Sequence, residues 1–584
     1  MPGGLMQLVG KGAQDHLVTG NPSFTHFRSM YKRHSEFAME HFRLVFQTTK
    51  TNLPPAGTLT MRAKVERFAQ LLHDCYLVVT LPDIYSPVYP VSQTHPNLNS
   101  SSNAIGYQFQ WIKSLGYNMI NYVAILINGQ EIVRHTGEWM KLYASLKFDA
   151  NKKEILNRMI GNVKEMYDPA NAYDRINQYP NAISSATESA EPSINGRTLH
   201  IPLHFWFCEN VGAALPLIAL QHSEVEIVVE LKNMYQLFTV LDVRETIGAT
   251  ANPNFGTRIA PDTSSNLFSI NNFLSPPLYS RSGSIPAVLN PGLVTWNLNP
   301  FIEANYIWLS DAEMVHVARS QHSFIFPQID VVSTMGQYGP SNDLELTMRN
   351  LGTRVVWVAQ RSDVAANNDY DNYTNWVNPD EPPLDSTSIT NMTPWYSSGT
   401  SQSTSVSQRD ILLDSTILLD GKERFTTKGT DFFSQLQPYR HHTGKALTSI
   451  PGIYSYSFAL DHGTHQPSGH INGSMFNKTI LRNSYIQPPT ISPNTVLSVC
   501  VLKSTVFNPN PTVIPQTSIT DPVTGLPVVD PKTGKPLYNP DDIVRVVTKT
   551  NAATLAYSFN VRAFVESYNF LRVMGGVASV VFSS

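Results

Sequence analysis

The chain has 584 residues, a formal net charge of -3 at pH 7 and 15% charged residues, below the roughly 25% of an average globular protein. A nearly neutral chain lacks the basic stripe that displaces counterions from phosphates, which argues against the wrapping of nucleic acid. Its length allows two large domains. Cys75, Cys208 and Cys500 are odd in number and widely separated, so we expect neither a disulfide framework nor a zinc site.

The N-terminal 50 residues carry six basic and three acidic side chains, and the difference of +3 is typical of solvated or interface surface. Asn21 and Pro22 resemble a helix N-cap and first turn, and Phe24, Phe27 and Tyr31 follow at helical spacing. This pattern predicts a short amphipathic helix before the first strand. No signal-like segment and no run of roughly 18 apolar residues is present, so we expect a soluble chain with at most peripheral membrane contact.

Beyond this segment, apolar and polar residues alternate with a period of two, which predicts strands with one buried face. The apolar positions of the clearest cases are Phe42, Leu44 and Phe46; Met61, Ala63 and Val65; Val225, Ile227, Val229 and Leu231; and Leu344, Leu346 and Met348. Long helices are scarce, and residues 137–160 hold the best candidate. These features predict an all-β protein of sandwiches or jelly rolls, with few short helices.

Three stretches rich in turn-forming residues interrupt the strands, at about 236–300, 361–410 and 505–550. We interpret them as long loop insertions. The last contains a doubled phrase, Asp521–Gly525 and Asp530–Gly534, with Asp, Pro and Gly at favoured turn positions. A pair of projecting turns explains it better than a calcium site, because no acidic cluster accompanies it.

Histidines provide the main argument for an enzyme, because cupins are jelly rolls that bind metal. One loop has a metal-like spacing of Asp461, His462, His465 and His470, but the His-x-His pair of cupins is absent. His441 and His442 should point to opposite faces of a strand and so do not join one site. Nucleophile elbows, zinc-protease motifs and phosphate loops are also absent from the sequence. We therefore expect no enzyme activity, no catalytic residue, no cofactor and no metal.

A second alternative is a carbohydrate-binding or adhesion protein, since such proteins also use β-sandwiches with aromatic loops. The insertion at 361–410 holds a group of aromatic residues that could stack on sugars: Tyr370, Tyr373, Trp376, Trp395 and Tyr396. Exposed aromatic side chains in insertions more often pack against neighbouring subunits. We therefore keep glycan binding as an alternative role.

Short sequence motifs occur one after another along nearly the whole chain. In the first half they are Gly3–Val9, Gly12–Asp15, Thr19–Pro22, Gly129–Ile132, Gly137–Trp139, Ile201–Cys208 and Ala214–Leu220. In the second half they are Leu419–Gly421, Gln437–Tyr439, His441–Thr443, Ile453–Leu460, His465–Gly469 and Tyr568–Gly576. In this order the phrases resemble the major capsid proteins of nucleocytoplasmic large DNA viruses. Gln70, Val133 and the length of 236–300 depart from the family pattern.

The resemblance implies two consecutive eight-stranded jelly rolls, a double jelly roll with long loop insertions. The expected division is an N-terminal arm at 1–24, a first jelly roll at 25–312 with its insertion at about 236–300, and a second jelly roll at 313–584 with insertions at about 361–410 and 505–550.

The resemblance also implies a structural function in the virion. Three copies would form a capsomer of hexagonal outline, and capsomers would tile an icosahedral shell assembled in the host cytoplasm. The implied partners are further copies of the chain, minor capsid and penton proteins, and an inner viral membrane that the N-terminal arm would face. Direct contact with nucleic acid is not expected.

Overall fold

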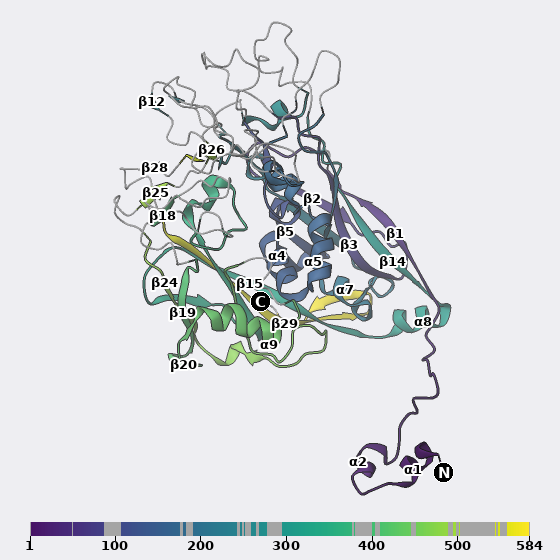
Figure 1. Ribbon diagram of the computed structural model, residues 1–584. Coiled ribbons are helices and arrows are strands. Elements are labelled where there is room, and N and C mark those ends of the chain that lie inside the picture. The colour runs from purple at the N-terminus through teal and green to yellow at the C-terminus, as the bar shows by residue number, and fades with distance from the viewer. Residues whose placement is uncertain are drawn as a thin grey trace.

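The computed structural model describes most of the chain. The described residues are 2–48, 51–86, 107–175, 179–180, 182, 191–241, 246–247, 250–251, 258–263, 268–276, 295–376, 379, 400–402, 409–444, 451–488, 495–497, 501–502, 543–544, 547–548 and 557–582. Figure 1 shows two β-sheet bodies side by side, with the N-terminal segment extending away from them. We call the body of strands β1 to β14 the N-terminal half and that of β15 to β30 the C-terminal half.

Two antiparallel sheets form the N-terminal half. In spatial order, one contains β1 (Phe37–Val45), β14 (Phe301–Leu309), β3 (Leu71–Thr80) and β7 (Thr198–Pro202). The other contains β2 (Leu59–Lys64), β9 (Val225–Leu231), β5 (Ile120–Ile127) and β6 (Gln130–Thr136). If these eight strands are numbered along the chain, the two sheets read 1-8-3-6 and 2-7-4-5. This is the strand order of a jelly roll.

The C-terminal half repeats this order. Its first sheet contains β15 (His322–Gln337), β29 (Phe559–Met574), β17 (Leu351–Arg361) and β22 (Ile453–Ser457). Its second sheet contains β16 (Asn342–Leu346), β24 (Thr479–Tyr485), β19 (Leu412–Leu419) and β20 (Lys422–Glu423). Numbered in the same way, the sheets again read 1-8-3-6 and 2-7-4-5. The prediction of two jelly rolls is therefore confirmed, and the duplication lies in topology rather than in a sequence repeat.

Short strands extend these sheets or form small ones. They are β4 (Gln110–Trp111), β8 (Leu215–Pro216), β10 (Phe238–Leu241), β11 (Thr246–Ile247), β12 (Thr250–Ala251), β13 (Arg258–Ile259), β18 (Thr400–Gln402), β21 (Lys428–Gly429), β23 (Ile471–Asn472), β25 (Thr495–Leu497), β26 (Val501–Leu502), β27 (Ile543–Val544), β28 (Val547–Thr548) and β30 (Val577–Val580). The doubled phrase of the third insertion lies outside the described residues.

Helices are short, as predicted. They are α1 (Gly3–Val9), α2 (Asp15–Thr19), α3 (Leu115–Met119), α4 (Gly137–Lys147), α5 (Ala150–Met159), α6 (Lys164–Tyr167), α7 (Trp206–Glu209), α8 (Asp311–Arg319) and α9 (Gln437–His441). The expected helix at 137–160 is confirmed as the pair α4 and α5. Side-chain oxygens cap both helices, since Thr136 accepts from the Trp139 amide at 3.1 Å and Asp149 accepts from the Lys152 amide at 2.8 Å.

The period-two pattern identified the strands and most of their inward faces. Met61, Ala63 and Val65 are buried, as are all four predicted apolar residues of β9. Phe42 differs, because it is only partly buried and stacks on Phe68 with ring centroids 4.5 Å apart. The first insertion differs as well: its side chains Phe238, Phe268, Ile270 and Phe273 are fully buried in the core of the N-terminal half.

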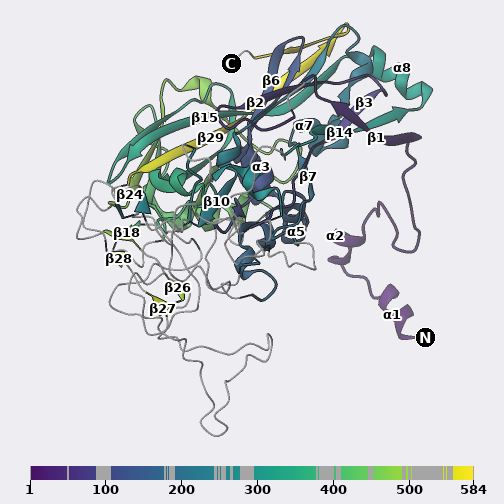
Figure 2. The ribbon, with the colours of Figure 1, turned by 90° about the horizontal axis from the view of Figure 1, so that it is seen from above.

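The predicted helix after Asn21 is wrong. Helices α1 and α2 precede this residue, and residues 20–36 contain no helix. The side chains of Phe24, Phe27 and Tyr31 are all exposed. An amphipathic helix is stabilised mainly by packing its apolar face, and this segment lies away from the sheets in both ribbon views (Figure 2). Among the described residues, these aromatic side chains therefore have no sheet or helix to pack against.

Candidate functional site: the seam between the two halves

Helix α4 of the N-terminal half packs on the first sheet of the C-terminal half, and we call this contact the seam. Its buried apolar cluster consists of Trp139, Leu142, Leu146, Val356, Val358, Tyr373, Ile453 and Phe564. The rings of Trp139 and Phe564 lie 5.6 Å apart between centroids. Burying each large side chain stabilises the folded state by about 1.5–3 kcal/mol. The cluster therefore holds the two jelly rolls together as one unit.

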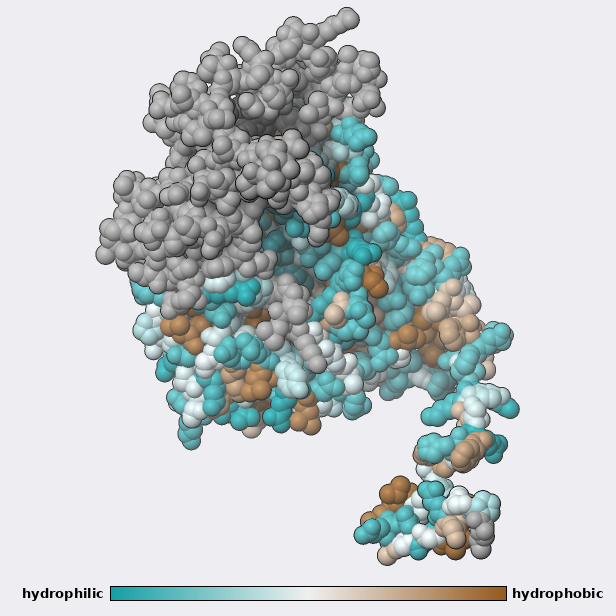
Figure 3. All heavy atoms as spheres, in the orientation of Figure 1, coloured by the Kyte–Doolittle hydropathy of each residue, from teal (hydrophilic) through white to brown (hydrophobic). Residues whose placement is uncertain are grey.

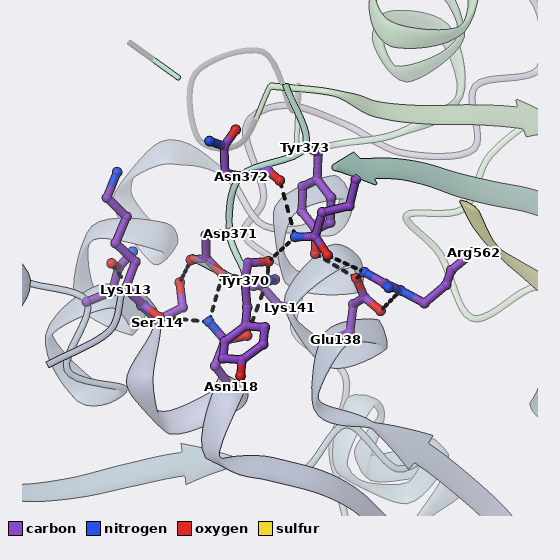
Figure 4. Close-up of polar contacts among 12 residues, drawn as sticks. Lys113, Ser114, Asn118, Glu138, Lys141, Tyr370, Asp371, Asn372, Tyr373 and Arg562 are labelled. Carbon is purple, nitrogen blue, oxygen red and sulfur yellow. Dashed lines mark hydrogen bonds and ion pairs between the residues drawn. The ribbon is translucent and has the colours of Figure 1, made fainter. Parts of the chain in front are cut away.

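Glu138 at the start of α4 forms an ion pair with Arg562 of β29 (Figure 4). Two nitrogens of the guanidinium group, Nε and Nη2, donate to the carboxylate at 2.6 and 2.7 Å. The Tyr373 hydroxyl donates to the same carboxylate at 2.9 Å. Burial alone would raise the pKa of Glu138, but the charge and hydrogen bonds of Arg562 hold this pKa below its usual value. The pair is therefore ionised and directional, which fixes how α4 sits on the sheet.

Lys141, one turn further along α4, pairs with Asp371 at 2.5 Å. The same carboxylate accepts hydrogen bonds from Ser114 at 2.5 Å and from Asn118 at 2.7 Å (Figure 4). Burial opposes ionisation of Asp371, but the Lys141 charge and these bonds keep its pKa below the usual value. Only 4% of the Lys141 side chain and 8% of the Asp371 side chain are exposed, so loss of one partner would leave a buried charge.

A second polar region of the seam surrounds a cavity of about 480 Å³. Lys147 pairs with Glu209 at 2.7 Å, and His204 contacts the same carboxylate at 3.0 Å. On the opposite wall, Arg354 binds Glu566 at 2.6 and 3.0 Å. Within each of these pairs the positive and negative charges compensate one another.

Histidines line or adjoin this cavity without forming a metal site. The rings of His442 and His462 stack with centroids 5.1 Å apart, beside the Arg354 guanidinium. Burial and the positive charge of Arg354 lower the pKa of His462 to about 2 and hold that of His442 well below its usual value. His441 ends helix α9, so our placement of His441 and His442 on a strand is wrong. The two imidazoles nevertheless do not share a site.

The sequence candidates for metal binding are not brought together. Asp461 accepts from the Gly463 amide at 2.8 Å, His462 contacts the Ser457 hydroxyl at 2.7 Å, and His465 and His470 are exposed. Among the described residues, no group of three or more His, Cys, Asp or Glu side chains could hold a metal ion.

The aromatic surface proposed for glycan binding also does not form as expected. Tyr373 is fully buried in the seam, and Tyr370 and Trp376 are partly buried. Trp395 and Tyr396 lie outside the described residues. Tyr373 and Tyr370 therefore pack between the two halves.

Two cysteines that are far apart in the sequence meet in space. The thiols of Cys75 and Cys208 both donate to the His73 carbonyl, each at 3.6 Å, and neither forms a disulfide. Their wide separation in the sequence did not indicate that these two side chains lie close together. Cys500 lies outside the described residues.

Sequence reasoning missed the seam pairs Glu138–Arg562 and Lys141–Asp371. Glu138 lies within a phrase that we used only to recognise the family, and Lys141 is a charged residue on an otherwise apolar face of α4. A lysine at a buried helix position is a usable signal, because such residues are seldom buried without a partner. The identity of that partner is not visible in the sequence.

The N-terminal segment presents a different kind of surface. All residues from 2 to 36 are exposed, including Leu5, Leu8, Leu17 and Phe27. Figure 3 shows apolar and polar groups intermixed on this segment, separate from the sheets. Among the described residues, no helix combines the length and apolar character that crossing a membrane requires.

Comparisons with known proteins agree with this architecture. Residues 25–265 match the family model "Major capsid protein N-terminus", and residues 313–494 match "Large eukaryotic DNA virus major capsid protein". The major capsid protein of Chrysochromulina ericina virus is 25% identical, over 82% of this chain and 93% of its own length. That of Paramecium bursaria Chlorella virus 1 is 23% identical over the full length of both chains.

Solved structures show the same fold. A chain of the PBCV-1 virus capsid aligns with a TM-score of 0.56 at 17% identity, covering 96% of this chain and 100% of its own. The Faustovirus major capsid protein aligns with a TM-score of 0.55 at 12% identity, covering 98% of this chain and 96% of its own. The matched relatives are structural capsid proteins rather than enzymes. The chain therefore belongs to the major capsid proteins of large eukaryotic DNA viruses, with a double jelly-roll fold and a structural role in the virion.

Proposed function

We propose that three copies of this chain form a capsomer of hexagonal outline, and that such capsomers tile the icosahedral shell. The observation that carries this proposal is the pair of jelly rolls with identical strand order, held side by side by the seam. Three such chains present six similar bodies around a threefold axis, which matches a hexagonal lattice. The buried ion pairs of the seam support a fixed angle between the two bodies.

The purified protein tests this proposal directly. Native mass spectrometry should give a particle of three times 65.1 kDa, and negative-stain microscopy should show hexagonal outlines. A protein that remains a monomer at micromolar concentration, with elongated two-lobed particles, would contradict the trimer. Binding to a glycan array by such a monomer would instead favour the adhesion alternative.

We infer a division into an arm at 1–24, a first jelly roll at 25–312 and a second at 313–584. Two facts support these bounds: the matched family models begin at residues 25 and 313, and helix α8 lies between the last strand of one half and the first strand of the other. The hairpin of β29 and β30 crosses this division, since Leu571, Val573 and Ala578 pack in the core of the N-terminal half. The halves are therefore expected to unfold together in one calorimetric transition.

We also propose that the arm faces the interior of the shell, toward minor capsid and penton proteins or an inner membrane, in particles assembled in the host cytoplasm. Its exposed apolar side chains support a role in binding, because they have no partner within the described part of the chain. A variant lacking residues 2–24 should still form capsomers but should lose co-sedimentation with minor capsid proteins or vesicles. Retention of both interactions would contradict this role, and tight DNA binding would contradict the absence of nucleic-acid contact.

A further inference from the structure

A smaller cavity of about 290 Å³ lies beside the seam ion pairs and is lined from both halves of the chain. Glu138, Lys141 and Lys232 come from the N-terminal half, and Arg361, Asn560 and Arg562 come from the C-terminal half. Figure 4 shows Glu138, Lys141 and Arg562 converging in this region, with Tyr370 between the two ion pairs. The cavity therefore lies where the two jelly rolls meet.

Four cationic side chains line the cavity, and three of them have a carboxylate partner. Lys141 pairs with Asp371 at 2.5 Å, Arg361 with Asp363 at 2.5 Å, and Arg562 with Glu138 at 2.6 Å. The fourth is Lys232, and it forms no ion pair or hydrogen bond through its ammonium group among the described residues. The four cationic side chains that line the cavity and their three carboxylate partners therefore carry one positive charge in excess.

Lys232 follows directly after β9, and its ammonium nitrogen lies 4.5 Å from the centroid of the Tyr370 ring. Its side chain is partly buried, and burial together with the positive charge of Lys141 lowers the pKa of Lys232 to about 8. A cation–π contact compensates an ammonium group only in part, because water normally supplies three hydrogen bonds to it. An anion in the cavity would supply the missing charge.

Asn560 of β29 lines the same cavity from the other half. Its side-chain amide has no hydrogen-bond partner among the described residues, although the residue is partly buried. An amide group offers two donors. Lys232 and Asn560 thus present unused donors to one cavity from opposite sides of the seam.

We propose that this cavity binds a small oxyanion of the phosphate class, held by Lys232 and Asn560, which bridges the two jelly rolls. An oxyanion carries several acceptor oxygens on one central atom, so it can accept hydrogen bonds from Lys232 and Asn560 on both walls of the cavity. A monatomic anion such as chloride offers no separate, directed acceptor atoms. The volume also suits an oxyanion, since it would leave room for waters that each occupy about 30 Å³. A bound cation is disfavoured by the excess positive charge.

Isothermal titration calorimetry of the intact protein with inorganic phosphate at pH 7 tests the proposal, with chloride and adenosine monophosphate as parallel ligands at matched ionic strength. One phosphate should bind per chain, and Lys232→Met should weaken binding by at least about tenfold, because a charge-assisted hydrogen bond is lost. Asn560→Ala should weaken it by a smaller factor. Tighter binding of the nucleotide than of phosphate would assign the oxyanion to a phosphoryl group on a larger molecule.

Lys153→Met is the matched control, because Lys153 is also buried but donates to the Gly444 carbonyl at 2.7 Å, outside this cavity. It should bind phosphate as the unaltered chain does. Absence of phosphate binding, equal affinity in Lys232→Met, or competition by chloride at the same concentration would each overturn the proposal. If Lys232→Met fails to fold, Asn560→Ala and Lys232→Arg provide the comparison, since Lys232→Arg should retain binding. Native mass spectrometry of the same samples reports trimer formation separately, so failure of the anion site leaves the capsomer proposal intact.

Discussion

Glu138 and Arg562 lie 424 positions apart in the sequence and form a bidentate ion pair across the seam, with nitrogen–oxygen distances of 2.6 and 2.7 Å. The pair joins the first turn of α4 to β29 of the C-terminal half. It orients one jelly roll against the other, whereas the buried apolar cluster beside it packs α4 against the sheet.

Arg562→Ala should destabilise the protein by about 2–4 kcal/mol, because the Glu138 carboxylate would remain partly buried without its partner. The expected cost is at the lower end for buried pairs, since 28% of the Arg562 side chain and 21% of that of Glu138 are exposed. Urea unfolding measures this loss of stability. Arg158→Ala is the control, because its pair with Glu154 is about 70% exposed and should contribute less than about 0.5 kcal/mol. Equal effects of the two changes would argue against a special role of the seam pair.

Asp371→Asn should be more damaging, with a loss of about 3–5 kcal/mol, because the Lys141 ammonium is almost completely buried. The double variant Asp371→Asn, Lys141→Met should recover part of this loss, since it removes the uncompensated charge. A double-mutant cycle from unfolding curves tests this coupling. Additive losses would show that the two side chains do not stabilise each other.

The protein should lose stability as the pH falls below 6.5, through its buried histidines. Burial, then the charge of His204, lowers the pKa of His135 from 6.5 to about 4, while Glu566 and Glu209 act in the opposite direction. A lowered pKa in the folded state means that stability is complete above pH 6.5 and declines as the pH falls from 6.5 toward 4. His135→Phe removes this proton uptake, so the melting temperature should depend less on pH between 6.5 and 4. An unchanged slope would assign acid sensitivity to other groups.

The Cys208 thiol should react slowly with alkylating reagents in the folded protein. Burial and hydrogen bonding with Cys75 raise the pKa of Cys208 well above its usual value, so little thiolate is present at pH 8. We expect alkylation by iodoacetamide at least about tenfold slower than in urea, as followed by peptide mass spectrometry. Rapid alkylation of Cys208 in the native state would show that α7 opens easily.

Removing residues 2–24 should leave the melting temperature of the protein unchanged, because no side chain in this segment is buried. Leu72→Ala is the contrasting change, since Leu72 is fully buried and its truncation should cost about 2–5 kcal/mol. Differential scanning calorimetry compares both variants with the full chain. A large loss on removal of the arm would place it against the body of its own chain or of a neighbour.

Much of the fold could be predicted locally. The alternation of Met61, Ala63 and Val65 identified both a strand and its buried face, because the side-chain period of a strand is a property of a few consecutive residues. Residues 137–160 were likewise identified from the local sequence as the best helix candidate, and helices α4 and α5 lie there. The same kind of local evidence was misleading after Asn21, because a helical spacing of aromatic residues gives a helix only where another surface covers them.

The sequence by itself thus determined the strand-rich class, the helical region at 137–160 and, through its family motifs, the capsid identity. Only the tertiary structure decided which distant residues meet: Glu138 with Arg562, Lys141 with Asp371, and Cys75 with Cys208. It also decided that Lys232 forms no ion pair with a carboxylate of the residues that the structure describes. The physical reason is that local periodicity specifies which face of an element is buried, whereas the partner of a buried charge depends on how complete sheets and helices pack together.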